Sequence, residues 1–213
     1  MNISIYIYDD IILVIYIDDI LIVDLFIQVY NIIIVDFPRN FEVINKDKVK
    51  SFLDLNIVRN YEKYAIIINQ SNYINRLFAK FNITNIKFIF IFFEIDIKLK
   101  LTMINNTFCN IKLYQEFIDF LNHLAIFTHS NIIFTIFKLS KYNFNSITTH
   151  FKVDLYILHY SKTIYNYYII YKKSINVFIF NIINYFDSGF ANNKNDRKSY
   201  INYIFLINND III

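Results

Sequence analysis

The feature that most constrains the fold is the apolar run from Ile11 to Val23, which two adjacent carboxylates, Asp18 and Asp19, interrupt. Placing ionised carboxylates among isoleucines is costly unless a cation or hydrogen bonds compensate. A strand, a tight acidic turn and a second strand resolve the conflict, because they put both carboxylates at a hairpin tip. Tyr16 stands two positions before the first of them. Such a tip can hold a divalent metal through oxygen ligands, and an ordinary surface hairpin with an acidic turn is the alternative.

The remaining turns must form with very little glycine or proline. The chain holds one of each, Gly189 and Pro38, whereas average usage gives roughly fifteen glycines and ten prolines at this length. Turns must therefore rest on asparagine and aspartate, which tolerate left-handed backbone better than other non-glycine residues. Isoleucine, phenylalanine, tyrosine, asparagine and lysine dominate instead. A/T-rich codons specify these residues, which indicates base-composition drift in the gene as well as selection on the protein.

Composition excludes few functional classes. The net charge of +3 is too small to argue by itself for a nucleic-acid partner. A single cysteine, Cys109, excludes an internal disulfide. The first ten residues lack the features of a signal peptide, and aspartate or asparagine breaks every apolar run before it reaches the roughly 18 residues of a membrane span. We expect an intracellular protein, cytoplasmic or nuclear, with no membrane partner; a membrane protein is the weaker alternative.

Hydrophobic periodicity predicts an α+β chain in which helices join two strand-rich regions. Strands are expected over 3–8, 11–17 and 20–23, with Asp9 and Asp10 in the first turn. A helix over 26–37 should end near Pro38. The later strands or extended segments are expected at 41–44, 52–58, 64–68, 165–171, 177–185 and 200–207, followed by a turn at 208–210, and the later helices at 71–81, 113–127, 132–142 and 147–161.

The helix expected after residue 70 shows its two faces clearly. Ser71 can cap it, and its apolar stripe consists of Ile74, Leu77, Phe78 and Phe81. Arg76 and Lys80 lie on another face, where they can contact phosphates or simply face solvent. The apolar stripes expected of the first and third helices in the later tract are Phe117, Phe120, Leu121 and Leu124, and Ile147, Phe151, Leu155 and Leu158.

From Leu13 to Ile22 the sequence resembles the Tyr-x-Asp-Asp hairpin of reverse transcriptases, most nearly that of copia-type LTR retrotransposons. Further segments resemble the same family in the family's own order. Phe52-Leu53-Asp54-Leu55 resembles its Phe-Leu-Gly-Ile segment, and Asp196 to Ser199 its Asp-Arg-Lys-Ser. Three further matches lie in the first two thirds of the chain: Phe41-Glu42-Val43 with Phe-Glu-Met; Gln70, Tyr73, Ile74 and Phe81 with the Ser-Gln-x-x-Tyr-Ile helix; and Tyr114, Ile118, Leu121, Leu124 and Ala125 with the Tyr-Arg-Ser-Leu-Ile-Gly-Ser-Leu-Leu-Tyr-Leu-Ala tract. Two more lie near the end. Tyr171-Lys172-Lys173-Ser174 resembles Tyr-Lys-Lys-Ser, and Tyr185, Asp187, Phe190 and Ala191 resemble the opening of the attached ribonuclease H domain.

The resemblance implies a domain plan and an activity. Residues 1–110 would be a partial polymerase palm and thumb, 111–163 a helical connection, and 164–213 the first strands of a ribonuclease H-like domain. The activity would be RNA-directed DNA polymerisation, in which two Mg²⁺ ions activate the primer 3′ hydroxyl and neutralise the triphosphate. Template-primer and deoxynucleotides would be the partners, together with polyprotein segments missing from this chain.

The resemblance also assigns roles to individual residues. Asp18 would be a metal ligand, Asp19 its helper, and Tyr16 would lie near the primer terminus. Phe52 and Leu53 would belong to the segment that holds the primer. Asp187 would be the first metal-binding carboxylate of a ribonuclease H site, and a strand-end aspartate without a role is the alternative.

Departures from the family pattern predict that the chain is inactive alone. The family's other essential palm aspartate lies upstream of the hairpin, and we expect it to fall outside this chain. Asp9 and Asp10 cannot replace it, because they lie at the far end of the same strand, roughly 25 Å from the tip. The remaining ribonuclease H carboxylates would lie beyond Ile213. Asp54, Asn82 and Asp119 replace family glycines, and His129-Ser130-Asn131 replaces Arg-Pro-Asp.

Other polar residues carry little signal. Cys109 has no paired histidine, and one glycine cannot build a phosphate loop. The four histidines lack metal-ligand spacing and are expected at the surface or satisfied in the core; they are His123, His129, His150 and His159. Tyrosines beside two lysines can stack on bases, although alternation between core and solvent explains them as well; they are Tyr165, Tyr167, Tyr168 and Tyr171, with Lys172 and Lys173.

Three functional hypotheses therefore stay open. The chain is a partial reverse transcriptase, a non-catalytic nucleic-acid-binding remnant, or a relic reading frame without function. The first hypothesis predicts primer extension. The second predicts salt-dependent binding that survives Asp18→Asn, and the third predicts that the protein is absent from cells.

Overall fold

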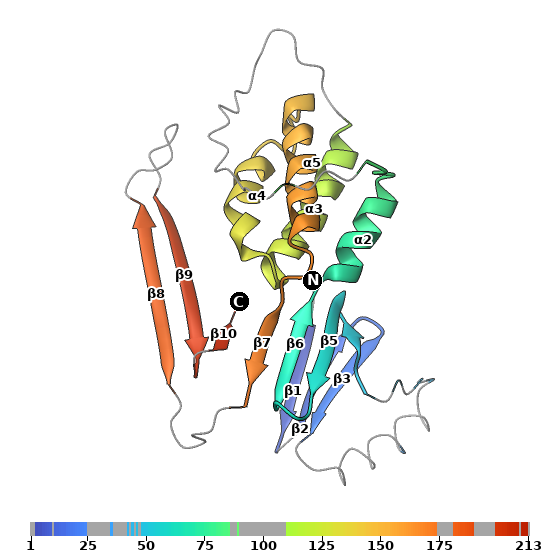
Figure 1. Ribbon diagram of the computed structural model, residues 1–213, viewed down its shortest axis with the longest axis vertical. Helices are drawn as coiled ribbons and strands as arrows, with labels where there is room; N and C mark the ends of the chain where they lie inside the picture. Colours follow the sequence, from blue (N-terminus) through green and yellow to red (C-terminus); the bar gives the residue numbers. More distant parts are fainter. Residues whose placement is uncertain are drawn as a thin grey trace. The chain divides into compact units, whose positions relative to one another are not determined.

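The computed structural model describes residues 3–9, 11–24, 35, 42, 44, 46, 48–85, 89, 110–173, 181–189, 199–208 and 210–212. Within them the chain is α+β, with four α-helices and three small antiparallel sheets (Figure 1). It divides into two compact units, Met1–Leu53 and Asp54–Ile213. No helix in the described part is long and apolar enough to cross a membrane.

The first sheet comprises β1 (Ile3–Tyr8), β2 (Ile11–Tyr16) and β3 (Asp19–Asp24) in sequence order, each antiparallel to its neighbour. The first strand matches its predicted bounds, and the other two agree to within one residue. All of β1 is exposed, and no described residue of this unit is buried. The sheet therefore has no core of its own in the described part. The helix expected over 26–37 and the segment over 41–44 lie outside the described residues, apart from Val35, Glu42 and Ile44.

The second sheet has the order β4-β5-β6-β7. Its strands are β4 (Ser51–Phe52), β5 (Leu55–Asn60), β6 (Ala65–Asn69) and β7 (Ile169–Lys172). The continuous segment expected over 52–58 is wrong, because a turn at Leu53 and Asp54 divides it into two strands. Ala65 of β6 pairs with Lys172 of β7. Strands from both sides of the helical tract thus share one sheet, whereas the sequence indicated two separate strand-rich regions.

The helices are α2 (Ser71–Lys80), α3 (Ile111–Phe127), α4 (Ile133–Ser140) and α5 (Thr148–Thr163), with a 3₁₀ turn at Ser130–Ile132. The stripes predicted for α2 and α3 are confirmed. Their buried members, with the partly buried Phe81 and Phe120 beside them, are Ile74, Leu77, Phe78, Phe117, Leu121 and Leu124. These side chains form the core of the second unit.

Two details of the helices differ from prediction. Ser71 is not the cap of α2: it is the first helical residue, and Asn69 Oδ1 accepts from its backbone N at 3.2 Å and its Oγ at 2.9 Å. In α5, Phe151 and Leu155 are only half-buried, and Val153 and Ile157 are buried instead. The reason is that α5 packs against α2, α3 and α4 together, which buries a broader face than a single stripe.

The third sheet comprises β8 (Ile182–Gly189), β9 (Tyr200–Ile207) and β10 (Asp210–Ile212) in the order β10-β9-β8. The strand predicted over 200–207 is confirmed, and the turn after it contains Asn208 with a positive φ of 51°. Of the strand expected over 177–185, the first four residues lie outside the described part. Asp210 Oδ2 accepts from the backbone N of Lys172 at 3.3 Å.

Candidate functional site

The acidic hairpin has a tip of two residues. β2 ends at Tyr16 and β3 begins at Asp19, and these two residues pair across the hairpin. Ile17 and Asp18 alone form the loop between them, as in the shortest hairpin connections. Asp18 and Asp19 are both exposed, and Tyr16 is half-buried. Both carboxylates thus lie in solvent at one end of the sheet, with Asp19 as the first residue of its strand rather than in the turn.

The residue between tyrosine and the aspartates is strained. Ile17 has a φ of 51°, in the left-handed region that is a genuine outlier for a β-branched residue. Glycine is the residue that adopts this conformation without cost. The turn therefore holds an unfavourable backbone at the position that sets the direction of Asp18.

Asp19 at the tip forms an exposed ion pair with Lys46. Lys46 Nζ lies 3.5 Å from Asp19 Oδ1, and the two side chains are 80% and 56% exposed. An ion pair this exposed contributes about 0–1 kcal/mol. It therefore leaves the Asp19 carboxylate available to another cation.

Asp18 and Asp19 offer carboxylate oxygens, the ligand type that hydrated divalent ions prefer. Mg²⁺ binds oxygen ligands, keeps several waters, and commonly uses one or two protein carboxylates together with substrate phosphates. Within the described ranges no group of three or more His, Cys, Asp or Glu side chains is placed to hold a metal. Asp9 does not join them, because Tyr8 pairs with Ile11 and the intervening turn lies at the opposite end of β2. Asp10 lies outside the described residues.

The segment that the resemblance assigns to the primer forms a second tight turn. Phe52 ends β4 and is half-buried, and Leu53 and Asp54 have φ values of 50° and 64°. Positive φ at both central residues is the type I′ pattern, which favours Asn-Gly and Asp-Gly. Asp54 forms an ion pair with Arg76 of α2. The charge that stands where the family has glycine is therefore paired with a cation.

A partly buried cluster lies beside this ion pair. The Tyr73 ring packs 4.7 Å from the His123 ring, and its hydroxyl donates to Phe120 O at 3.2 Å. Burial, and secondarily the Asp54 carboxylate, raises the pKa of Tyr73. Burial lowers the pKa of His123. Burial thus favours the neutral form of both side chains.

A hydrogen-bonded chain continues from this cluster into the core. Gln70 Nε2 lies 3.2 Å from His123 Nδ1, Thr128 Oγ1 donates to Gln70 Oε1 at 2.6 Å, and Thr128 Oγ1 lies 2.7 Å from His129 Nδ1. His129 is 1% exposed, and burial lowers its pKa to about 4. The sequence did not predict this series of hydrogen bonds, because its members lie up to 59 positions apart and their spacing matches no metal-ligand motif. It joins the start of α2 to the end of α3, which is a structural role.

Asp187 belongs to no group of three or more His, Cys, Asp or Glu side chains among the residues that the structure describes. It is exposed in β8, where it pairs with Asn202 of β9 two residues before the strand ends. Phe190, Ala191 and residues 196–198 lie outside the described part. The described geometry therefore gives Asp187 a strand position and no partner for metal binding.

The chain was also compared with known proteins. No family model matches it, and no solved structure matches it.

Proposed function

We propose that this chain is part of a reverse transcriptase of the copia-type retrotransposon class, and that Asp18 and Asp19 belong to its nucleotidyl-transfer site. One observation carries the proposal. Tyr16 and Asp19 pair across a two-residue tip, and both carboxylates face solvent. With this arrangement, a metal-bound triphosphate and a primer terminus would reach the carboxylates from the solvent side.

The backbone supports the same proposal at two positions where the family has glycine. Asp54 and Asn82 have φ values of 64° and 51°, in the region that glycine adopts most readily. The third such position, Asp119, lies inside α3. Descent from glycine-containing turns explains why non-glycine residues occupy left-handed backbone at Asp54 and Asn82.

The same geometry limits what this chain does alone. A bound Mg²⁺ would supply charge neutralisation for the triphosphate and activation of the primer hydroxyl. Asp18 and Asp19 would hold that ion, and Tyr16 would flank the primer end. The resemblance implies a further palm aspartate upstream of the hairpin, which we expect outside this chain. We therefore propose a degenerate fragment without polymerase activity of its own.

The decisive experiment examines the DNA that flanks this reading frame. The DNA on both sides of the reading frame is sequenced, and any longer in-frame product is assayed for templated primer extension with Mg²⁺. We expect an upstream strand carrying an aspartate, extension by the longer product, and loss of extension in Asp18→Asn. Asp9→Asn, at the other end of β2, is the matched control that retains activity. Extension that survives Asp18→Asn contradicts the proposal, as does a longer product that never extends a primer.

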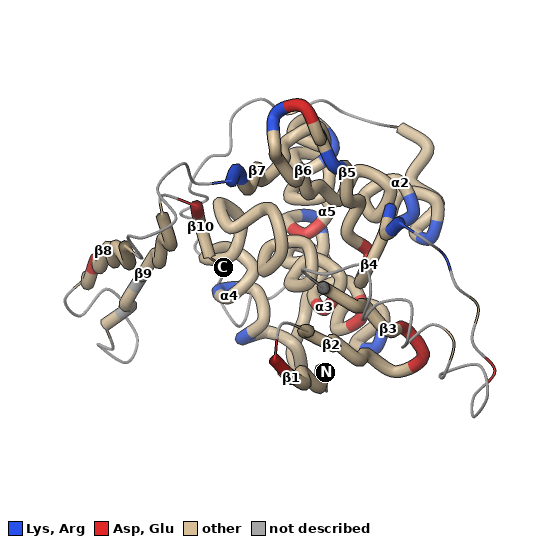
Figure 2. Tube along the Cα trace, turned by 90° about the horizontal axis from the view of Figure 1, so that it is seen from below, with Lys and Arg blue, Asp and Glu red and all other residues tan. Residues whose placement is uncertain are grey.

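Nucleic-acid binding without catalysis is the second candidate. Lys173 Nζ lies 5.6 Å from the centre of the exposed Tyr64 ring, and Tyr167 and Tyr168 are also exposed. Figure 2 shows basic residues at β7 and along α2. Aromatic rings beside lysines bind single strands by stacking and charge. This candidate predicts binding that weakens steeply with salt, is unchanged in Asp18→Asn and falls in Lys173→Ala.

A further inference from the structure

Strand β8 is an unpaired edge of the third sheet (Figure 1). The order of that sheet is β10-β9-β8, so among the described strands β9 alone pairs with β8. β8 is eight residues long, and none of them is buried. It lacks the lysine and proline residues that commonly protect an edge, and Asp187 is its one charge. An edge of this kind is open to pairing with another strand.

The hydrogen bonds at the start of β8 identify the backbone groups on its free side. Asn208 N donates to Asn181 O at 2.9 Å, so these two residues form a hydrogen-bonded pair. Such pairs alternate with non-hydrogen-bonded pairs along an antiparallel ladder. The odd-numbered residues of β8 therefore bond to β9, beginning at Ile183. The N–H and C=O groups of the even-numbered residues are directed away from β9, and these residues are Ile182, Asn184, Phe186 and Ser188.

The four outward residues are complementary to the same four residues of a second copy. When two β8 strands pair antiparallel about a two-fold axis at Tyr185, Ile182 lies opposite the second copy's Ser188, and Asn184 lies opposite its Phe186. All four outward residues of each strand then bond to the other strand. Every other axis along β8 places at least one of the four opposite a residue outside the strand, and an axis at Asp187 sets two carboxylates directly opposite each other, which is destabilising.

Pairing of this kind gives the third sheet what it lacks by itself. No described residue of β8, β9 or β10 is buried, and three strands without a buried face are marginal in water. The side chains of Ile182, Tyr185 and Phe186 are 59%, 59% and 69% exposed. In the paired arrangement each of them gains a cross-strand neighbour, and the two sheets become one of six strands.

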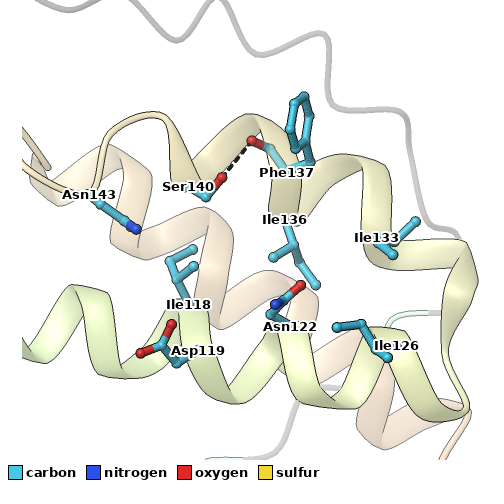
Figure 3. Close-up of a pocket in the computed structure, with 9 residues that line it drawn as sticks. All are labelled: Ile118, Asp119, Asn122, Ile126, Ile133, Ile136, Phe137, Ser140 and Asn143. Carbon is cyan, nitrogen blue, oxygen red and sulfur yellow. Dashed lines mark hydrogen bonds between the residues drawn. The ribbon is translucent and has the colours of Figure 1, made fainter. Parts of the chain in front are cut away.

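The pocket between α3 and α4 specifies no partner in this way (Figure 3). Its walls are mainly apolar, with Ile126, Ile133 and Phe137 among the lining residues, and Asp119 is its one charged group. A single exposed carboxylate beside an apolar wall selects no particular ligand. The free edge of β8, in contrast, specifies both a partner and a register.

We propose that β8 pairs with β8 of a second copy of this chain, antiparallel and with Tyr185 on the two-fold axis. The interface is separate from the acidic hairpin, which belongs to the other compact unit. Tyr185 and its counterpart form a non-hydrogen-bonded pair, in which the side chains lie closest together.

Sedimentation equilibrium and hydrogen exchange of the full chain over a range of concentrations test the proposal. We expect a monomer–dimer equilibrium. As the concentration rises, the amides of Asn184, Phe186 and Ser188 should become protected, whereas those of Tyr185 and Asp187, which already bond to β9, should change less. A chain that is monomeric at every concentration overturns the proposal, and so does a dimer in which the even-numbered amides of β8 stay unprotected.

Two matched variants test the position of the axis. Tyr185→Lys sets two ammonium groups directly opposite each other in place of an aromatic pair, and should weaken the dimer by about tenfold. Tyr203→Lys adds the same charge on β9, more than a Debye length from its counterpart, and should change the dissociation constant by less than about twofold. Tyr185 and Tyr203 are 59% and 63% exposed, so neither substitution removes a buried side chain. Equal weakening by the two variants, or a dimer that Tyr185→Lys leaves unchanged, overturns the proposal.

Discussion

Asp154 occupies the environment that suits its side chain least. It lies on α5 with no exposed surface, and neither carboxylate oxygen has a hydrogen-bond partner among the described residues. Burial raises its pKa well above the ordinary 3.8. A carboxyl with a raised pKa keeps its proton in the folded chain while the unfolded chain loses it. Stability therefore falls as pH rises from about 3.8 toward the raised pKa.

Asp154→Asn should stabilise the chain at neutral pH. The amide has nearly the same shape and cannot ionise, so the variant does not lose stability as pH rises, whereas the buried acid does. We expect a gain on the order of 1 kcal/mol or more in the free energy of unfolding at pH 7, shrinking toward zero below the ordinary pKa of the acid. Denaturant titrations across the pH range measure this difference.

Asp119→Asn serves as the control, because that side chain is exposed and a surface substitution should change the free energy of unfolding little. A variant at position 154 that is no more stable than the parent at pH 7 would show that the carboxyl has an ionic partner in solution.

In the turns, several residue types are poorly suited to the backbone conformation that they adopt. Within the described ranges, seven non-glycine residues have positive φ, and four of them are asparagine or aspartate, as the composition predicted. The other three are Ile17, Leu53 and Tyr64, which have no such tolerance. The chain therefore carries backbone strain in three tight turns, two of which contain residues of the proposed site.

Ile17→Gly should stabilise the acidic hairpin. Relief of the left-handed isoleucine outweighs the entropy that glycine loses on folding, for a net gain of about 1 kcal/mol. Ile15→Gly, within β2, should instead destabilise it by about 1 kcal/mol. Hydrogen exchange of the β2 and β3 amides measures both effects. Equal losses in the two variants would mean that position 17 is not left-handed in solution.

Local patterns of apolar and turn residues decided which elements could be predicted from the sequence. α2 and α3 were predictable because Ile74, Leu77, Leu121 and Leu124 repeat at helical spacing and one face of each helix is buried. The division of 52–58 was not, because Leu53-Asp54 lacks the Asn-Gly or Asp-Gly signal of a type I′ turn. The hairpin tip was predictable from its paired carboxylates, but the pairing of β6 with β7 joins residues about a hundred positions apart and has no local signal.

At the scale of the whole molecule, burial is confined to one of the two units. Every buried residue that the structure describes lies in Asp54–Ile213, where α2, α3, α4 and α5 share a core. The described part of Met1–Leu53 has none. Three strands without a buried face are marginal in water. The unit that carries the acidic hairpin therefore depends on contacts beyond its own described residues.

Hydrogen exchange of the full chain should show this division directly. Amides of α3 and α5 should exchange only through global unfolding, and amides of β1, β2 and β3 should exchange through local opening at a much lower free energy. Comparable protection in the two units would show that the first sheet is covered in solution.

The central claim is that Asp18 and Asp19 form a metal-binding tip. Paramagnetic broadening by Mn²⁺, titrated into the ¹⁵N-labelled chain, tests it most directly because it needs no catalysis. The claim predicts broadening centred on the amides from Tyr16 to Ile20, abolished in the Asp18→Asn/Asp19→Asn double variant and unchanged in Asp9→Asn. Broadening centred on Asp9, or a tip that stays sharp while other acidic residues broaden, would contradict it.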